Sequence, residues 1–173
     1  MTDSDTTLRS VIIWTREGTW RATVDAALSL APAQARFTVL HVTSPAAAYA
    51  ARGAHLGLLG RGGRDPGVRF DEVAAEAAAD LVEAAARRLG RPCERLEIRD
   101  QSERAVVAAS AHADLLIVAR DGDRSRLGPK SLGRATRFVV DHAACPVLLV
   151  WPDPAPDVGT MPPPPHQSHL GGR

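Results

Sequence analysis

The sequence predicts one doubly wound α/β domain, in which a mainly parallel sheet carries helices on both faces. Short apolar segments alternate along the chain with longer segments of helical periodicity, and this alternation is typical of βα units. The segments between successive strands are long enough for the right-handed crossovers that join parallel strands. A length of 173 residues and a hydrophobic fraction of 45% suit a single domain, which we place at residues 10–151.

The amino-terminal half of the domain begins with two strands joined by a helix. After a polar leader at residues 1–9, the apolar run at residues 11–14 predicts the first strand. Thr19 is a suitable N-cap for the helix that follows, and Pro32 lies just past the end of that helix. Residues 37–42 are rich in β-branched side chains and predict the second strand.

Residues 44–67 interrupt this alternation. Their glycines and Pro66 break any long element, so we expect a flexible insert on the surface. A helix follows at residues 68–89, because apolar residues recur on one face until Gly90 ends the pattern. A weaker apolar run at residues 96–98 predicts the third strand.

The carboxyl half of the chain contains the clearest strand. A helix from Ser102 precedes residues 115–118, which are all apolar, as is typical of a strand buried on both faces. A further helix is expected at residues 131–142 and a fifth strand at residues 147–150. Proline is frequent after the last strand, so residues 152–173 are expected to form an extended or disordered tail.

The composition excludes several classes of function. The 21 basic and 20 acidic residues nearly balance, so nucleic acid is not expected as a partner. Two cysteines are too few for a disulfide framework or a four-ligand zinc site, and no metal site is expected. The longest apolar runs have about six residues, which is too short to span a membrane. Together with the polar start of the chain, these features favour a reducing, cytoplasmic setting.

A ligand site is expected at the carboxyl ends of the central strands. In open parallel sheets ligands bind where the strand order reverses, which here lies between the loops at residues 15–18 and 120–130. Glycines at positions 122, 128 and 133 let the backbone approach a ligand closely. The helix that starts near residues 131–133 presents unpaired N–H groups that attract anions.

The second of these loops is strongly basic. From Arg120 to Arg137 there are six basic residues and two acidic ones. Two interpretations remain open. Either the basic side chains and the start of the helix form a phosphate site, or the loop is solvated and its arginines pair with nearby carboxylates.

The chain resembles the universal stress protein family. The resemblance rests on residues 113–118 (ADLLIV), on the glycine-containing loop and on residues 133–150, whose ending HAACPVLLV is the most specific part. The order of strands and helices agrees over about residues 10–151. The resemblance implies a five-stranded sheet of order 3-2-1-4-5, often dimeric through the last strand. It also implies that some members bind ATP and others do not.

The glycine loop departs from the pattern of the ATP-binding members. That pattern is Gly, two residues, Gly, nine residues, Gly, and then Ser or Thr. Here Ala119 stands at the first position, and ten residues separate Gly122 from Gly133. Arg134 stands at the position of the hydroxyl residue. The phosphate-binding part of the motif is therefore degenerate.

Two positions on other strands complete the comparison with the family. Arg16 stands where ATP-binding members place an acidic residue near the ribose, and Glu17 comes one residue late. Val42 matches a position whose backbone commonly meets adenine. Arg124 and Arg134 either replace the hydroxyl contacts by charge, or ATP is no longer bound and the loop serves another anion or a protein. The candidate nucleotide-binding residues are Arg16, Val42, Ala119, Arg120, Gly122, Arg124, Arg126, Lys130, Gly133 and Arg134.

The resulting prediction is a stress-response protein of the universal stress type that binds ATP or another phosphate-bearing nucleotide. Neither a Ser–His–Asp order nor paired carboxylates stand at a strand end, so we expect no enzyme. The alternative is a dimeric protein-interaction module of the same fold that has lost nucleotide binding.

The last strand is expected at the edge of the sheet. An apolar edge strand must be covered or paired, so we expect a homodimer in which two such strands pair antiparallel. The candidate interface residues are Val147, Leu148, Leu149, Val150 and Trp151.

Overall fold

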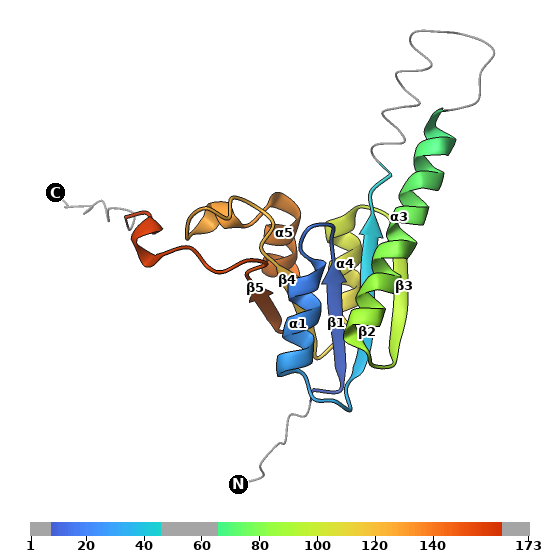
Figure 1. Cartoon of the computed structure of the whole chain (residues 1–173), viewed down its shortest axis with the longest axis horizontal. Helices are drawn as coiled ribbons and strands as arrows, with labels where there is room; N and C mark the ends of the chain where they lie inside the picture. The colour runs from blue at the N-terminus through green and yellow to red at the C-terminus, as the bar shows by residue number, and fades with distance from the viewer. Residues whose placement is uncertain (1–7, 46–65, 164–173) are drawn as a thin grey trace, which may run out of the picture.

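The computed structural model describes residues 8–45 and 66–163. In this part of the chain, five parallel strands form one sheet in the order β3-β2-β1-β4-β5 (Figure 1). The strands are β1 (Ser10–Thr15), β2 (Arg36–Thr43), β3 (Cys93–Arg99), β4 (Leu115–Ala119) and β5 (Val147–Val150). The helices are α1 (Trp20–Leu30), α3 (Pro66–Leu89), α4 (Ser102–Ser110) and α5 (Arg134–His142), with 3-10 turns η1 (Pro129–Ser131) and η2 (Val158–Thr160). The predicted fold class and strand order are confirmed.

The sheet is buried on both faces, because helices cover each of them. Val11 and Ile13 of β1 join the apolar cluster under α1 and α3, whereas Ile12 and Trp14 join the cluster under α4 and α5. Side chains alternate between the faces of a strand, so the continuous apolar run of β1 supplies both clusters. Among the described residues, no helix has the length and apolar character needed to cross a membrane.

The third strand is longer than its apolar pattern indicates. β3 pairs with β2 from Phe37 opposite Cys93 to Thr43 opposite Arg99, whereas the sequence predicts only residues 96–98. Most residues of β3 are exposed, because this strand lies at the edge of the sheet. Backbone pairing with β2, rather than an apolar run, defines its length.

Two helix starts differ in detail from the prediction. Thr19 is the N-cap of α1 as expected, but its hydroxyl donates to the carbonyl of Arg16 (3.4 Å) and caps no N–H of the helix. The helix predicted at residues 131–142 begins at Arg134, because Gly133 has extended backbone and is the N-cap. Of the predicted insert, residues 46–65 lie outside the described part of the chain.

The segment after β5 packs against the loop between β4 and α5. Thr160 in η2 accepts a hydrogen bond from the backbone N–H of Leu127 (3.0 Å). A Cβ at Gly128 would lie 3.3 Å from the ring of Pro162, so the two segments are in close contact. The described part of the proline-rich tail therefore packs against this loop. Residues 164–173 lie outside the described part.

Candidate functional site

A crevice of about 350 Å³ opens at the carboxyl ends of β1 and β2, beside the loop that follows β4. It lies between the two loops at which the sequence predicts a ligand site. Its volume is near the lower end of the range for small-molecule sites. The residues that line it are Arg16, Glu17, Gly18, Thr19, His41, Val42, Asp121, Gly122 and Arg124.

The carboxylate of Asp121 takes the position at the start of α5 where an anion was expected. Its Oδ1 accepts a hydrogen bond from the backbone N–H of Gly133 (2.8 Å), and its Oδ2 accepts one from Nη1 of Arg16. The side chain of Asp121 is only 12% exposed. The amide group and one arginine that suit a phosphate are thus bonded to a carboxylate of the chain itself.

Arg16 joins the loop after β1 to the start of α5. Besides Asp121, its Nη1 lies 3.4 Å from the hydroxyl of Thr136 in the first turn of α5. Its guanidinium carbon lies 5.2 Å from the centre of the Trp14 ring, within the range of a cation–π contact. The side chain remains 37% exposed, so the rest of the guanidinium faces the crevice and solvent.

The loop after β4 is closed at its base by backbone hydrogen bonds. The N–H of Gly122 donates to the carbonyl of Ser131 (3.0 Å), and the N–H of Asp123 donates to the carbonyl of Lys130 (2.8 Å). A Cβ at position 122 would come within 2.3 Å of the Lys130 carbonyl oxygen. Glycine at this position is therefore required by the approach of two backbone segments.

The arginines of this loop are held by partners within the chain. Arg124 forms an ion pair with Asp153 in the segment after β5 (2.8 Å), and Arg126 forms one with Asp123 (2.9 Å). Arg120 donates to the hydroxyl of Ser131, and its guanidinium stacks 4.6 Å from the centre of the Trp151 ring. The structure therefore contains the pairing that the second interpretation of the basic loop expects.

Hydrogen bonds to Asp123 affect its ionisation. The hydroxyl of Ser125 (2.6 Å) and Nε of Arg126 (2.9 Å) both donate to this carboxylate. These bonds, with a further one from the Ser125 N–H, lower the pKa of Asp123 to about 2. Asp123 therefore stays ionised at neutral pH and holds Arg126 on the outside of the loop.

The candidate nucleotide-binding residues fall into two groups. Arg16, Val42, Gly122 and Arg124 line the crevice, and Gly133 contacts it through Asp121. The others lie elsewhere: Ala119 is buried at the end of β4, Arg120 faces Trp151, Arg126 pairs with Asp123, and Lys130 and Arg134 are exposed.

Sequence reasoning missed several polar groups of the crevice. Asp121 stands in the basic loop next to Gly122, and the preference of helix starts for acidic groups is the signal that was available for it. Thr19 comes from the loop after β1, as does Glu17, which the comparison with the family placed one residue late. His41 lies in β2, and because the Thr15 carbonyl oxygen can only accept, Nδ1 of His41 donates to it (2.9 Å). In the neutral ring, Nε2 is then an acceptor.

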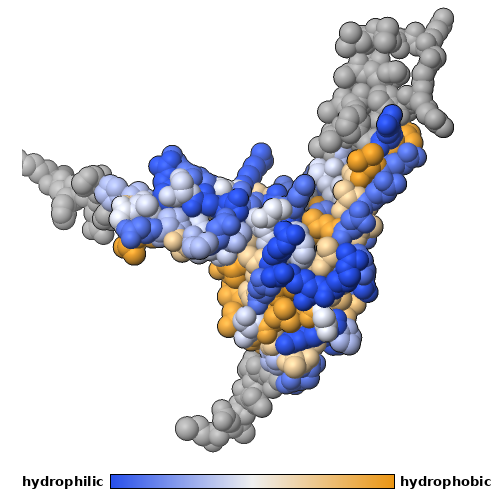
Figure 2. Space-filling model, in the orientation of Figure 1, coloured by the Kyte–Doolittle hydropathy of each residue, from blue (hydrophilic) through white to orange (hydrophobic). Residues whose placement is uncertain are grey.

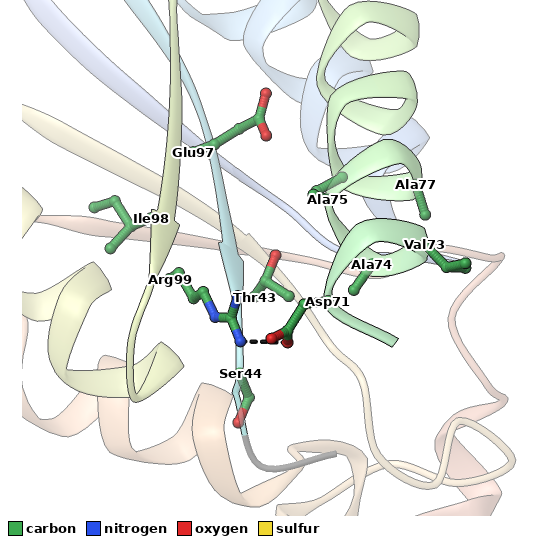
Figure 3. Close-up of a pocket in the computed structure, with 11 residues that line it drawn as sticks. Thr43, Ser44, Asp71, Val73, Ala74, Ala75, Ala77, Glu97, Ile98 and Arg99 are labelled. Atoms are coloured by element: carbon green, nitrogen blue, oxygen red, sulfur yellow. Dashed lines mark hydrogen bonds and ion pairs between the residues drawn. The ribbon is translucent and has the colours of Figure 1, made fainter. Parts of the chain in front are cut away.

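A second cavity of about 300 Å³ lies at the same edge of the sheet, between α3 and the ends of β2 and β3 (Figure 3). An ion pair between Arg99 and Asp71 links β3 to α3 beside it. Its walls are mainly apolar, and α3 contributes small side chains to them, including those of Ala74 and Ala78. This cavity shares no lining residue with the crevice.

The described residues contain no group of three or more His, Cys, Asp or Glu side chains placed to hold a metal ion. Both cysteines are free, and partial burial raises the pKa of Cys93 and of Cys145. Their thiols are therefore less reactive than an exposed cysteine.

β5 lies at the edge of the sheet, with β4 on one side. Its four residues are half-buried, and Trp151 follows directly. Figure 2 shows apolar residues on the flank of the molecule where Figure 1 places β5 and α1. The candidate interface residues Val147, Leu148, Leu149, Val150 and Trp151 thus occupy a free strand edge within the described part of the chain.

Known structures share this fold. The hypothetical protein MJ0577 is 16% identical, with a TM-score of 0.64, and the match covers 84% of this chain and 96% of that one. A universal stress protein in complex with cAMP is 20% identical, with a TM-score of 0.57 and coverage of 86% and 100%. An Arabidopsis thaliana protein of the universal stress family, with AMP bound, is 15% identical, with a TM-score of 0.52 and coverage of 89% and 95%. At these identities the likeness concerns the fold.

The family is shown by the sequence itself. No curated relative matches the chain. Residues 17–150, which include most of the domain and the whole loop after β4, match the model of the universal stress protein family. The resemblance seen in the sequence is confirmed, and this chain belongs to the universal stress protein family.

Proposed function

We propose that this protein is a non-catalytic member of the stress response that binds an adenine nucleotide in the crevice. The observation that carries the proposal is the crevice itself, which opens where the strand order reverses and brings together polar groups from two loops and from the end of β2. Two proteins of the same fold are described with cAMP and with AMP, which supports a nucleotide as the class of ligand.

Each part of a nucleotide has a counterpart in the lining of the crevice. Val42 is 8% exposed and offers an apolar contact to the base, and His41, which also lines the crevice, offers its Nε2 as an acceptor. Glu17 offers a carboxylate to the hydroxyl groups of the ribose. The exposed part of the Arg16 guanidinium offers a positive charge to a phosphate.

Binding without chemistry follows from the state of the acidic groups. A general base must be free to take a proton, but both oxygens of Asp121 already accept hydrogen bonds, and we assign Glu17 to the ribose hydroxyls. We therefore expect that ATP incubated with the protein is recovered without conversion to ADP. We also propose a cytoplasmic location, which suits two free cysteines, and a homodimer through β5.

Calorimetric titration with adenosine, AMP, cAMP and ATP tests the proposal. Binding of at least one adenine ligand is expected, and Glu17→Ala should weaken it roughly tenfold through the loss of a charged acceptor. Glu76→Ala is the matched control, since Glu76 is exposed on α3 and does not line the crevice. Absence of heat for all four ligands, with a normally folded protein, would overturn the proposal.

A protein-interaction module is the second candidate, and one observation favours it. The Asp121 carboxylate already accepts hydrogen bonds from the N-cap amide of α5 and from Arg16, so an anionic group of the chain itself stands there without a ligand. If no adenine ligand binds, this second function is the one that remains. In that case, cross-linking should give the same fraction of homodimer with and without an added adenine ligand.

A further inference from the structure

We propose that Asp121 is the specificity-determining residue of the crevice, because its carboxylate competes with the phosphate of a ligand. The inference rests on the proposed function and deepens it. The native crevice therefore prefers adenine ligands of low negative charge, and each further phosphate weakens binding.

Two hydrogen-bond donors hold the carboxylate of Asp121. One is the backbone N–H of Gly133, the N-cap of the nine-residue helix α5, at 2.8 Å from Oδ1. The other is the guanidinium of Arg16, which donates to Oδ2. A helix-terminal N–H and a guanidinium are the groups that commonly bind phosphate oxygens. A phosphate that entered this place would need the donors that Asp121 uses.

The start of α5 lacks room for both the Asp121 carboxylate and the phosphate of a ligand. A Cβ at Gly133 would lie 2.8 Å from each oxygen of Asp121, so the carboxylate fills the space beside the glycine. The side chain of Asp121 is 12% exposed and thus little screened by water. A phosphate beside it would meet a like charge at close range, and such juxtaposition is strongly unfavourable. A phosphate must therefore displace the carboxylate or stay away from the start of α5.

The Asp121 side chain is not needed to hold the shape of the loop after β4. The backbone of the loop is fixed without the Asp121 side chain, by the bonds from Gly122 to Ser131 and from Asp123 to Lys130. Arg120 adds a hydrogen bond to the Ser131 hydroxyl. Removal of the charge at position 121 should therefore leave the shape of the loop unchanged.

The test compares two substitutions of the same chemical kind in one loop. Asp121→Asn removes the negative charge but keeps an oxygen that can accept the Gly133 N–H. Asp123→Asn is the matched control, because Asp123 pairs with Arg126 and does not line the crevice. Each protein is titrated with adenosine, AMP, ATP and inorganic pyrophosphate.

We compare the affinities of the native protein for the different ligands, and those of each variant with those of the native protein. The native protein should bind adenosine at least as tightly as ATP. Asp121→Asn should raise the affinity for ATP at least about tenfold, with a smaller gain for AMP, because the like-charge penalty is removed. Its affinity for adenosine should change by less than about threefold, since adenosine carries no phosphate to compete. Asp123→Asn should match the native protein for all four ligands.

The outcomes distinguish this inference from the proposed function. A native protein that prefers ATP to adenosine overturns the inference, and this arm needs no variant. Equal ATP affinities in the native protein and in folded Asp121→Asn also overturn it. If Asp121→Asn gains pyrophosphate binding while no adenine ligand binds either protein, Asp121 is confirmed as the competitor and the proposed nucleotide function fails.

Discussion

Asp121 and Asp123 stand two residues apart, yet their carboxylates have different surroundings. Asp121 turns inward to Arg16 and the start of α5, whereas Asp123 turns outward to Ser125 and Arg126. The sequence shows two acidic residues in a basic loop and so predicts that ion pairs are available. It does not show which carboxylate faces the crevice, because Arg16 lies 105 positions from Asp121 in the chain. The fold alone brings these two side chains together.

The lowered pKa of Asp123 predicts a pH-dependent contribution to stability. Its folded pKa of about 2 lies below the usual value of 3.8, so its carboxylate stabilises the fold above pH 4. This contribution is lost as the pH falls through the folded pKa. Asp123→Asn should therefore unfold at a lower temperature than the native protein at pH 6, and the difference should shrink towards pH 2. Thermal unfolding followed by circular dichroism at several pH values measures it; a difference that is the same at every pH contradicts the prediction.

The elements of the domain differ in how well their sequences predict them. β4 is apolar throughout and buried on both faces, so a run of four residues was enough to find it. β3 lies at the edge and alternates in exposure, so only its central residues gave a signal. The crevice was located because its position follows from strand order, which the resemblance to the family supplied. Its lining depends on side-chain directions in loops, which periodicity does not encode.

Helix α3 packs on the sheet with small side chains and leaves the cavity of Figure 3 beside β2 and β3. Ala74→Leu should fill part of this space and stabilise the protein by about 0.5–1 kcal/mol. Ala79→Leu is the control, since Ala79 is exposed on the same helix and does not line the cavity. Both changes have the same intrinsic cost in a helix. Urea unfolding should give a higher midpoint for Ala74→Leu than for Ala79→Leu, and equal midpoints would contradict the cavity-filling effect.

At the scale of the whole molecule, β5 ends the sheet and exposes one edge of its backbone. The carbonyls of Pro146 and Val150 accept hydrogen bonds from Leu116 and Arg120 and thus face β4. The backbone N–H and C=O groups of successive residues point to opposite sides of a strand. Those of Val147 and Leu149 therefore face the free edge. These are the groups that a second copy of the chain would pair with in the proposed homodimer.

Leu149→Pro tests that pairing, because proline removes a backbone donor at the free edge without a loss on the β4 side. The native protein should have twice the chain mass of 18.4 kDa in light scattering, and Leu149→Pro should have the mass of one chain. Leu149→Val keeps the N–H and should stay dimeric. A native protein that is a single chain at micromolar concentration would rule out the homodimer.

All three tryptophans contact arginines, and two of these pairs, at Trp14 and Trp151, give the site a built-in optical signal. Trp14 lies under Arg16, whose guanidinium also holds Asp121, and Trp151 lies under Arg120 at the base of the loop after β4. Cation–π contacts of this kind depend on distance, so a shift of either arginine alters the environment of an indole. Tryptophan emission can therefore follow the occupancy of the crevice without any added label. Phenylalanine at position 14 or 151 would show from which side the signal arises.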